Sequence, residues 1–207
     1  MIPKRIIYCW FGKGEKPETV KNFINSWKKY MPDWEYLEVN ENNFDYNSCE
    51  YSKKAYENKK WAYVSDVARV WALYNYGGVY LDTDIEVYQS FEKLLDNKFF
   101  VGVEQPHYFG NATMGAEPKN PIVKLMLDKY ETGEEKWELK EHWYEYRTAP
   151  MILTDILEKY VDRDSMDYQK TTDITVYPKK YFVNHEQKDD EVFCKHYMLG
   201  SWCDKWK

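Results

Sequence analysis

WAYVSDVARVWALYNYGGVYLDTDIE, residues 61–86, contains the pattern that decides the fold. Apolar side chains at helical spacing predict a helix over Trp61–Tyr76, and the Gly77-Gly78 pair is typical of its C-terminal end. Residues 79–81 then form a short apolar strand that leads into Asp82-Thr83-Asp84. A helix, a tight turn and a strand in this order indicate a layered α/β unit with two aspartates at the end of a strand.

The same alternation of strands and helices extends toward both ends of the chain. Runs of β-branched and aromatic residues predict strands at 5–10, 34–39, 99–103, 175–177 and 192–197. Helical spacing of apolar residues predicts helices at 18–31, 50–58, 121–130 and 149–160. Because no linker, repeat or low-complexity tract interrupts this order, we expect residues 1–207 to form a single α/β domain whose central sheet is mostly parallel and flanked by helices.

Composition restricts the classes of function. A net charge of −6 argues against a nucleic-acid partner, because such proteins neutralise phosphates with basic side chains. No run reaches the ~18 apolar residues of a membrane span, so membrane association is expected to be peripheral at most, at the inner face. The four cysteines form no CxxC pair and no zinc-ligand spacing, which favours a reduced, cytoplasmic protein.

Asp82 and Asp84 are the strongest candidates for chemistry. On an extended segment, residues two apart share a face, so both carboxylates are expected to point the same way. Carboxylates at the carboxyl edge of a sheet bind Mg²⁺ or Mn²⁺, whose other positions phosphate oxygens can fill. A second Asp-x-Asp, at 162–164, lies in a polar stretch after a helix and is expected to be a solvated loop.

Two other regions admit more than one interpretation. Asp66 and Arg69 lie three residues apart on the same face of the predicted helix. They form either an ordinary surface ion pair or one wall of the aspartate pocket. His196 and the Gly-Ser-Trp of residues 200–202 form either a loop that closes over a ligand or a packed C-terminal tail. The glycines of Gly12-Lys13-Gly14 are not a dinucleotide fingerprint, because the third glycine of that motif is replaced by Pro17.

Four blocks of the chain resemble the DXD-motif glycosyltransferase family 32. They are IPKRIIYCWFG at 2–12, AYVSDVAR at 62–69, GGVYLDTDIE at 77–86, and His196 with Ser201-Trp202. The family includes bacterial capsular and lipopolysaccharide sugar transferases and fungal initiating mannosyltransferases, and it is related to the glucosylating domains of clostridial toxins. The blocks occur in the family's order and span nearly the whole chain.

The resemblance implies a GT-A fold, a nucleotide-sugar donor, Mn²⁺ or Mg²⁺ as cofactor and retention of anomeric configuration. It assigns Asp82, Asp84 and Arg69 to catalysis, and Asp82, Asp84 and His196 to the metal. It implies that Trp10 stacks on the base, that Asp66 and Arg69 hold the sugar hydroxyls, and that Ser201 and Trp202 reach the β-phosphate. The full donor-binding set that it implies is Trp10, Phe11, Ser65, Asp66, Arg69, Asp82, Asn111, Ser201 and Trp202.

The residues and the resemblance together predict a retaining, metal-dependent hexosyltransferase of surface or capsular polysaccharide synthesis. We expect a UDP-sugar donor rather than a GDP-sugar, and an oligosaccharide or lipid-linked acceptor. A protein-glycosylating effector is an alternative within the same class. A non-catalytic sugar-binding or nucleotide-binding module and a metal-dependent phosphohydrolase are alternatives from other classes. The phosphohydrolase would need further metal ligands beside the aspartates, and in the sequence Glu86 alone lies near them.

Overall fold

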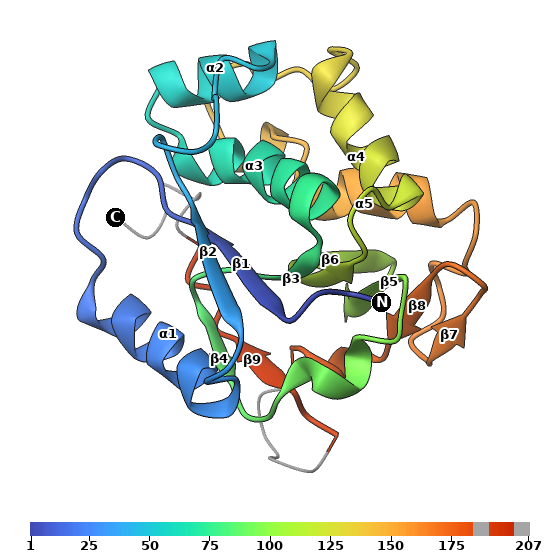
Figure 1. Cartoon of the computed structure of the whole chain (residues 1–207). Helices are drawn as coiled ribbons and strands as arrows, with labels where there is room; N and C mark the ends of the chain where they lie inside the picture. The colour runs from blue at the N-terminus through green and yellow to red at the C-terminus, as the bar shows by residue number, and fades with distance from the viewer. Residues whose placement is uncertain (184–190, 201–207) are drawn as a thin grey trace.

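The computed structural model describes residues 1–183 and 191–200 as three layers with a twisted sheet in the middle (Figure 1). The strands are β1 (Arg5–Cys9), β2 (Glu35–Val39), β3 (Gly78–Leu81), β4 (Ile85–Val87), β5 (Phe99–Gln105), β6 (Tyr108–Ala116), β7 (Gln169–Lys170), β8 (Thr175–Tyr177) and β9 (Cys194–His196). The α-helices are α1 (Glu18–Tyr30), α2 (Glu50–Glu57), α3 (Trp61–Tyr76), α4 (Pro121–Glu131) and α5 (Ala149–Leu157).

The main sheet has the strand order β2-β1-β3-β6-β5-β8-β7. The pairs β1–β2, β1–β3 and β5–β8 are parallel, whereas β6 pairs antiparallel with both β3 and β5, and β7 is antiparallel to β8. Five strands therefore run in one direction and two run against them, which confirms the expected α/β class with a mostly parallel sheet. A separate two-stranded sheet joins β4 to β9.

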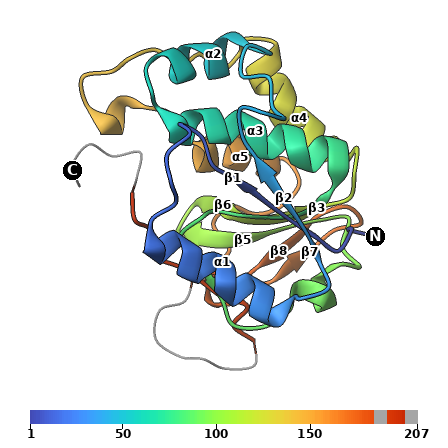
Figure 2. The ribbon, with the colours of Figure 1, turned by 60° about the vertical axis from the view of Figure 1, so that its left-hand side comes forward.

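Side chains alternate between the two faces of the sheet and form two cores. Ile7 and Tyr80 point to the core beneath α2, α3, α4 and α5, and Ile6 and Val79 point to the core beneath α1 and the β4–β9 pair. The view turned by 60° shows α1 on one side of the sheet and the other four helices on the opposite side (Figure 2). Within the described ranges, none of the helices is long and apolar enough to cross a bilayer.

The glycine pair after α3 sets the path from helix to strand. Gly77 has a positive φ of 63° and its N–H donates to the Leu73 carbonyl, which ends the helix. Gly78 has a φ of 133°, and a Cβ at this position would lie 2.7 Å from the Arg5 carbonyl oxygen of β1. The close approach of β3 to β1 requires a residue without a side chain here. The strand consequently starts beside β1 and delivers Asp82 to the carboxyl edge of the sheet.

Candidate nucleotide-sugar and metal site

The Asp82-Thr83-Asp84 segment is a turn between β3 and β4, not the extended strand that we expected. The Ile85 N–H donates to the Asp82 carbonyl at 3.1 Å, and the Asp82 N–H donates to the Ala112 carbonyl of β6 at 2.8 Å. The argument from alternating strand faces was therefore wrong for these two residues. Their carboxylates nevertheless lie close together, because the turn folds both toward the same side.

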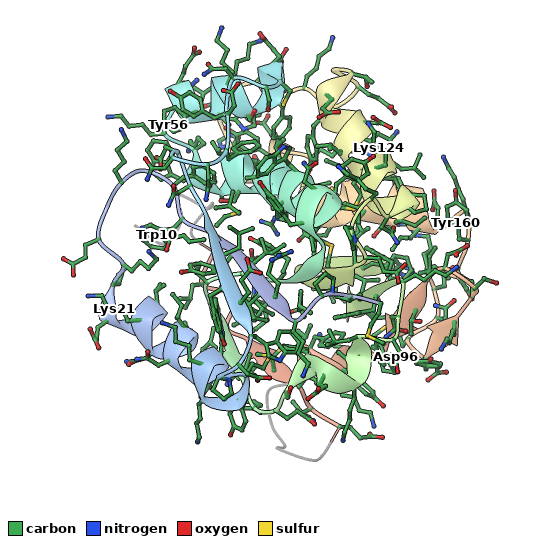
Figure 3. The ribbon with its side chains drawn as sticks, viewed as in Figure 1. Trp10, Lys21, Tyr56, Asp96, Lys124 and Tyr160 are labelled. Atoms are coloured by element: carbon green, nitrogen blue, oxygen red, sulfur yellow. The ribbon has the colours of Figure 1, made fainter. Side chains whose placement is uncertain are left out.

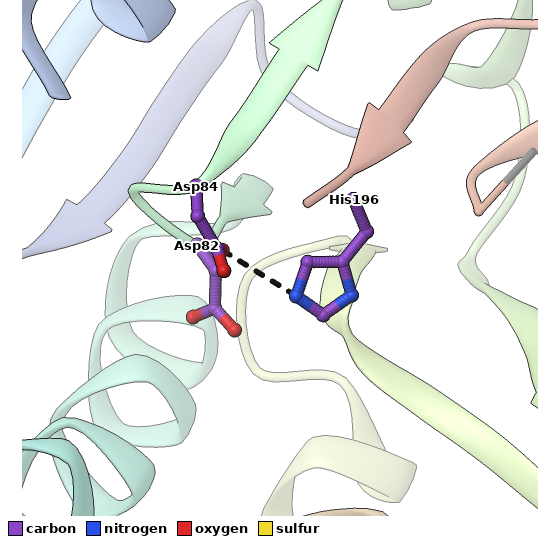
Figure 4. A group of neighbouring side chains, drawn as sticks. All are labelled: Asp82, Asp84 and His196. Atoms are coloured by element: carbon purple, nitrogen blue, oxygen red, sulfur yellow. Dashed lines mark ion pairs between the residues drawn. The ribbon is translucent and has the colours of Figure 1, made fainter. Parts of the chain in front are cut away.

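His196 comes to the aspartates through the second sheet. In the β4–β9 ladder Ile85 pairs with His196. His196 therefore lies opposite the residue that directly follows Asp84 in the chain. Its Nε2 is 3.4 Å from Asp84 Oδ1 (Figure 4). One ligand atom from each of Asp82, Asp84 and His196 lies within 4.8 Å of the other two. In the part of the chain that the structure describes, these three residues are the group that can hold a metal ion.

Arg69 joins α3 to this cluster. Its guanidinium forms an ion pair with Asp66 at 2.9 Å and one with Asp82 at 3.3 Å, and it donates to the backbone carbonyls of Asn111 and Ser65 at 3.1 and 3.3 Å. Asp66 is 9% exposed and Arg69 is 5% exposed. Because both are buried, the interpretation of this pair as an ordinary surface ion pair is wrong. The helix face forms a wall of the aspartate pocket, as the alternative interpretation required.

Burial and neighbouring charges shift the pKa values of the three aspartates of the pocket in different directions. Burial raises the pKa of Asp82 and the neighbouring Asp84 raises it further, although Arg69 opposes both effects. Burial also disfavours ionised Asp84, but hydrogen bonding and charge from His196 and the Leu199 N–H bond outweigh it, so the pKa of Asp84 is lowered. Burial raises the pKa of Asp66 to about 7, since Arg69 only partly opposes the effect of burial and the charge of Asp82 adds to it. One guanidinium thus serves a buried and a partly buried carboxylate, and a further cation would relieve their repulsion.

The structure places the other predicted donor-binding residues in different surroundings. Trp10 is half-buried after β1, with its Nε1–H on the Gly14 carbonyl and Lys16 Nζ 5.5 Å from its ring centroid. Figure 3 shows Trp10 and Tyr56 on one side of the molecule, with Lys124 and Tyr160 on the other. Phe11, by contrast, is buried in the core against Phe44, so its side chain is not brought to the aspartates.

Ser65 and Asn111 both contact Arg69 through their backbone carbonyls, and their side chains have different surroundings. The Ser65 hydroxyl donates to the Trp61 carbonyl one helical turn earlier. Asn111, on β6, is 5% exposed, and no described residue accepts a hydrogen bond from its Nδ2. Ser201 and Trp202 lie outside the described residues. The exposed loop at 162–164 confirms the expectation that its Asp-x-Asp is solvated.

Two residues of the site were missed in the sequence. Tyr80 donates its hydroxyl to Asp82 Oδ1 at 2.7 Å, and its ring lies 4.7 Å from the Arg69 guanidinium carbon. Glu104, at the end of β5, borders a small cavity with His196. The alternation of β3 indicates which face Tyr80 occupies, but not that its hydroxyl reaches an aspartate. Nothing local marks Glu104, because its neighbourhood depends on how β5 pairs in the sheet.

Comparison with known proteins agrees with this geometry. The family described as "Glycosyltransferase sugar-binding region containing DXD motif" matches residues 17–101. Inositol phosphoceramide mannosyltransferase 2 of Schizosaccharomyces pombe is 28% identical over 173 residues, which cover 77% of this chain and 47% of that protein. Inositol phosphoceramide mannosyltransferase 3 of the same yeast is 25% identical over 207 residues, 98% of this chain and 56% of that protein. The chain thus spans about half the length of the curated relatives it matches.

Among solved structures, the PaToxG glycosyltransferase matches with a TM-score of 0.57 at 21% identity, over 77% of this chain and 70% of that chain. At this identity the match establishes the fold. Residues 17–101, which match the DXD family, include both the Arg69 helix and the two aspartates that the structure places in one pocket. The resemblance to DXD-motif glycosyltransferases is therefore confirmed: their sugar-binding region matches residues 17–101, and the fold is of the GT-A type.

Proposed function

We propose that this chain is a retaining, divalent-metal-dependent glycosyltransferase that moves a hexose from a nucleotide sugar to a glycan or lipid-linked acceptor. The observation that carries the proposal is the convergence of Asp82, Asp84 and His196 beside the buried Arg69–Asp66 pair. These groups come from the carboxyl end of β3, from β9 and from α3, and they meet at the edge of the sheet where open α/β folds bind ligands.

The donor set fits a divalent ion. Two carboxylates and one imidazole suit Mn²⁺, whereas Mg²⁺ prefers ligands that are all oxygen. The side chains of Asp84 and His196 are 17% and 12% exposed, so the ligands are partly shielded and still open on one side. When bound, the ion would neutralise the negative charge that develops on the departing diphosphate.

Asp66 and Arg69 have separate tasks in this proposal. The donors of Arg69 already bond to Asp66, Asp82 and two backbone carbonyls, so Arg69 orients the carboxylates. Asp66 uses Oδ1 for Arg69, and no described residue bonds to its Oδ2. We assign Oδ2 of Asp66 to a hydroxyl of the donor sugar. A hydroxyl held by a buried carboxylate is positioned at low entropic cost, which favours a single orientation of the anomeric carbon.

Retention is proposed to proceed by attack on the same face as the leaving group, with a phosphate oxygen taking the acceptor proton. Double displacement would instead need a carboxylate nucleophile at the anomeric carbon. Mass spectrometry of the protein after a rapid quench with slow fluorinated donors tests this. We expect unmodified protein, and a glycosyl adduct on any carboxylate, Glu104 included, would contradict same-face attack.

The names of the fungal relatives support a lipid-linked acceptor and favour mannose among the hexoses that the sequence leaves open, since they are inositol phosphoceramide mannosyltransferases. We retain UDP as the favoured nucleotide and test it directly against GDP. A cytoplasmic location and a role in surface or capsular polysaccharide synthesis remain predictions.

Thermal unfolding with UDP, GDP or no nucleotide, each with Mn²⁺ or EDTA, is the decisive experiment. A ligand present at ~100 times its Kd stabilises the native state by about 2.7 kcal/mol, a shift of several degrees for a domain of this size. We expect one nucleotide to raise Tm with Mn²⁺ only, and this shift to vanish in Asp84→Ala. Asp164→Asn is the matched control, because it removes an exposed carboxylate from the other Asp-x-Asp. A rise in Tm that survives EDTA and Asp84→Ala would favour a metal-independent binding module instead.

A further inference from the structure

Glu104 and His196 face one small cavity between β5, β6 and the segment near residue 182. The cavity measures about 10 Å³, which is room for a single water molecule. Phe182 and Val183 cover it with apolar side chains. Gly110 on β6 makes the space for the glutamate, because a Cβ there would lie 2.9 Å from Glu104 Oε2.

The two ring nitrogens of His196 have different surroundings. Nε2 faces Asp84 Oδ1 at 3.4 Å, and the other nitrogen points away from both aspartates (Figure 4). That second nitrogen, Nδ1, is buried, and no described residue forms a hydrogen bond with it. A histidine that binds a metal through one nitrogen usually donates its other N–H to an acceptor, which fixes the tautomer and the ring orientation.

Glu104 borders the same cavity as His196 and is a carboxylate without an assigned partner. Among residues 1–183 and 191–200, none forms a hydrogen bond or ion pair with it. Burial raises the pKa of Glu104 and the charge of His196 opposes that rise, which supports their proximity. Glu104 and His196 border one water-sized cavity, and a half-buried carboxylate is complementary to a buried ring nitrogen without a partner if that nitrogen carries a proton.

We propose that Glu104 is the positioning residue of His196, its carboxylate accepting the Nδ1–H through one bridging water so that the Nε2 lone pair faces Asp82 and Asp84. This inference rests on the proposed function only where it concerns the binding of the metal ion. The orientation of the imidazole itself follows from the cavity and its two polar groups. Glu104 would then act on the ion through His196, without touching it.

The first test reads the tautomer without any metal. Long-range ¹H–¹⁵N spectra of ¹⁵N-histidine-labelled protein at pH 8.5 in EDTA report which nitrogen of His196 carries the proton, with His196→Gln used to assign the signal. Asp84 competes for the proton at Nε2 when no metal is present, so we expect the Nδ1–H fraction of the neutral imidazole to be higher in the wild-type protein than in Glu104→Met. Glu104→Gln keeps an acceptor oxygen and should retain most of it. An unchanged tautomer in folded Glu104→Met would overturn the inference.

The second test measures Mn²⁺ affinity by isothermal titration in the presence of UDP or GDP. Loss of a residue that orients a metal ligand typically weakens binding 10–100-fold, so we expect about this loss in Glu104→Met and a smaller one in Glu104→Gln. Glu57→Met, at an exposed glutamate of α2, is the control and should bind as the wild type does. Equal affinity in all three variants would also overturn the inference. If the wild-type protein binds no Mn²⁺, the proposed function fails and the tautomer alone decides the role of Glu104.

Discussion

Arg69 is the residue that balances the buried charges of the site. It pairs with Asp66 and Asp82, and its side chain is 6% exposed. Removal of one member of a buried ion pair leaves the other charges uncompensated, which costs about 3–5 kcal/mol. We therefore expect Arg69→Met to lower the free energy of unfolding by that amount, measured by urea denaturation.

Arg163 provides the matched control for this prediction. It pairs with Glu158 in an exposed loop, and both side chains are about one-third exposed. Such pairs contribute little, so Arg163→Met should stay within about 0.5 kcal/mol of the wild-type protein. Equal losses in the two variants would show that Arg69 is not buried among carboxylates as described.

Asp66 makes the stability of the protein depend on pH. Burial raises its pKa from 3.8 to about 7 in the folded protein, so the native state binds a proton more tightly than the unfolded chain does. The stability associated with that proton is present below about pH 4 and is lost as pH rises toward 7. Asparagine does not titrate, so Asp66→Asn should not show this loss of stability.

The measurement is urea unfolding of both proteins in EDTA at pH 5 and pH 8. We expect the free energy of unfolding of the wild-type protein, minus that of Asp66→Asn, to be larger at pH 5 than at pH 8. A difference that stays constant or grows with pH would mean that Asp66 is ionised throughout, held by Arg69 alone.

At the scale of elements, β6 is the longest of the strands that the sequence did not reveal. Its residues include Gly110, Asn111 and Gly115, which have low strand propensity, yet it lies between β3 and β5 at the centre of the sheet. The glycines are there because neighbouring side chains occupy the space, as the Phe100 ring does against Gly115. Such a strand is determined by its neighbours, so no local pattern identifies it.

Gly115→Ala tests this packing. The added methyl group would overlap the Phe100 ring, and overpacking of a core typically costs about 1–3 kcal/mol. We expect this loss in urea denaturation, and partial recovery when Phe100→Leu is added. Gly14→Ala is the control, because no atom lies within 4 Å of the new Cβ and its φ is not positive. A neutral Gly115→Ala would contradict the described contact between β5 and β6.

Elements with strong local signals were predicted closely. The helix expected over Trp61–Tyr76 has those bounds, and β1, β2 and α1 differ from expectation by a residue at one end. The last long helix was expected to reach residue 160 and ends at Leu157. The short strand β4 was missed, because three residues carry too little periodicity and the strand exists through its pairing with β9.

At the scale of the whole molecule, the site is assembled from distant parts of the chain. Trp10 follows β1, Arg69 lies on α3, and His196 ends β9, so the pocket requires both ends of the described chain to be folded. This arrangement leads us to expect one cooperative domain. Cys9 in β1, Cys49 just before α2 and Cys194 in β9 are buried free thiols, and their reactivity can report on cooperative unfolding.

Pulsed alkylation in a urea series, followed by mass spectrometry, measures the unfolding midpoint at each cysteine. In a Cys203→Ser background we expect the three described thiols to become reactive at the same urea concentration, because two-state unfolding exposes all of them together. Reaction of Cys194 at a lower midpoint than Cys9 would instead show that the β4–β9 sheet opens independently of the main sheet.

The sequence by itself determined the α/β class, the helix from Trp61 to Tyr76 and the importance of Asp82 and Asp84, because these depend on local periodicity and on a motif of adjacent residues. Only the tertiary structure decided that Arg69 is buried between Asp66 and Asp82, that Asp82-Thr83-Asp84 is a turn, and that His196 and Glu104 share a cavity. The contact of Arg69 with Asp82 joins residues 13 positions apart, and the shared cavity joins Glu104 to His196, which are 92 positions apart. Contacts of this kind are set by the fold as a whole, so the spacing of residues along the chain does not reveal them.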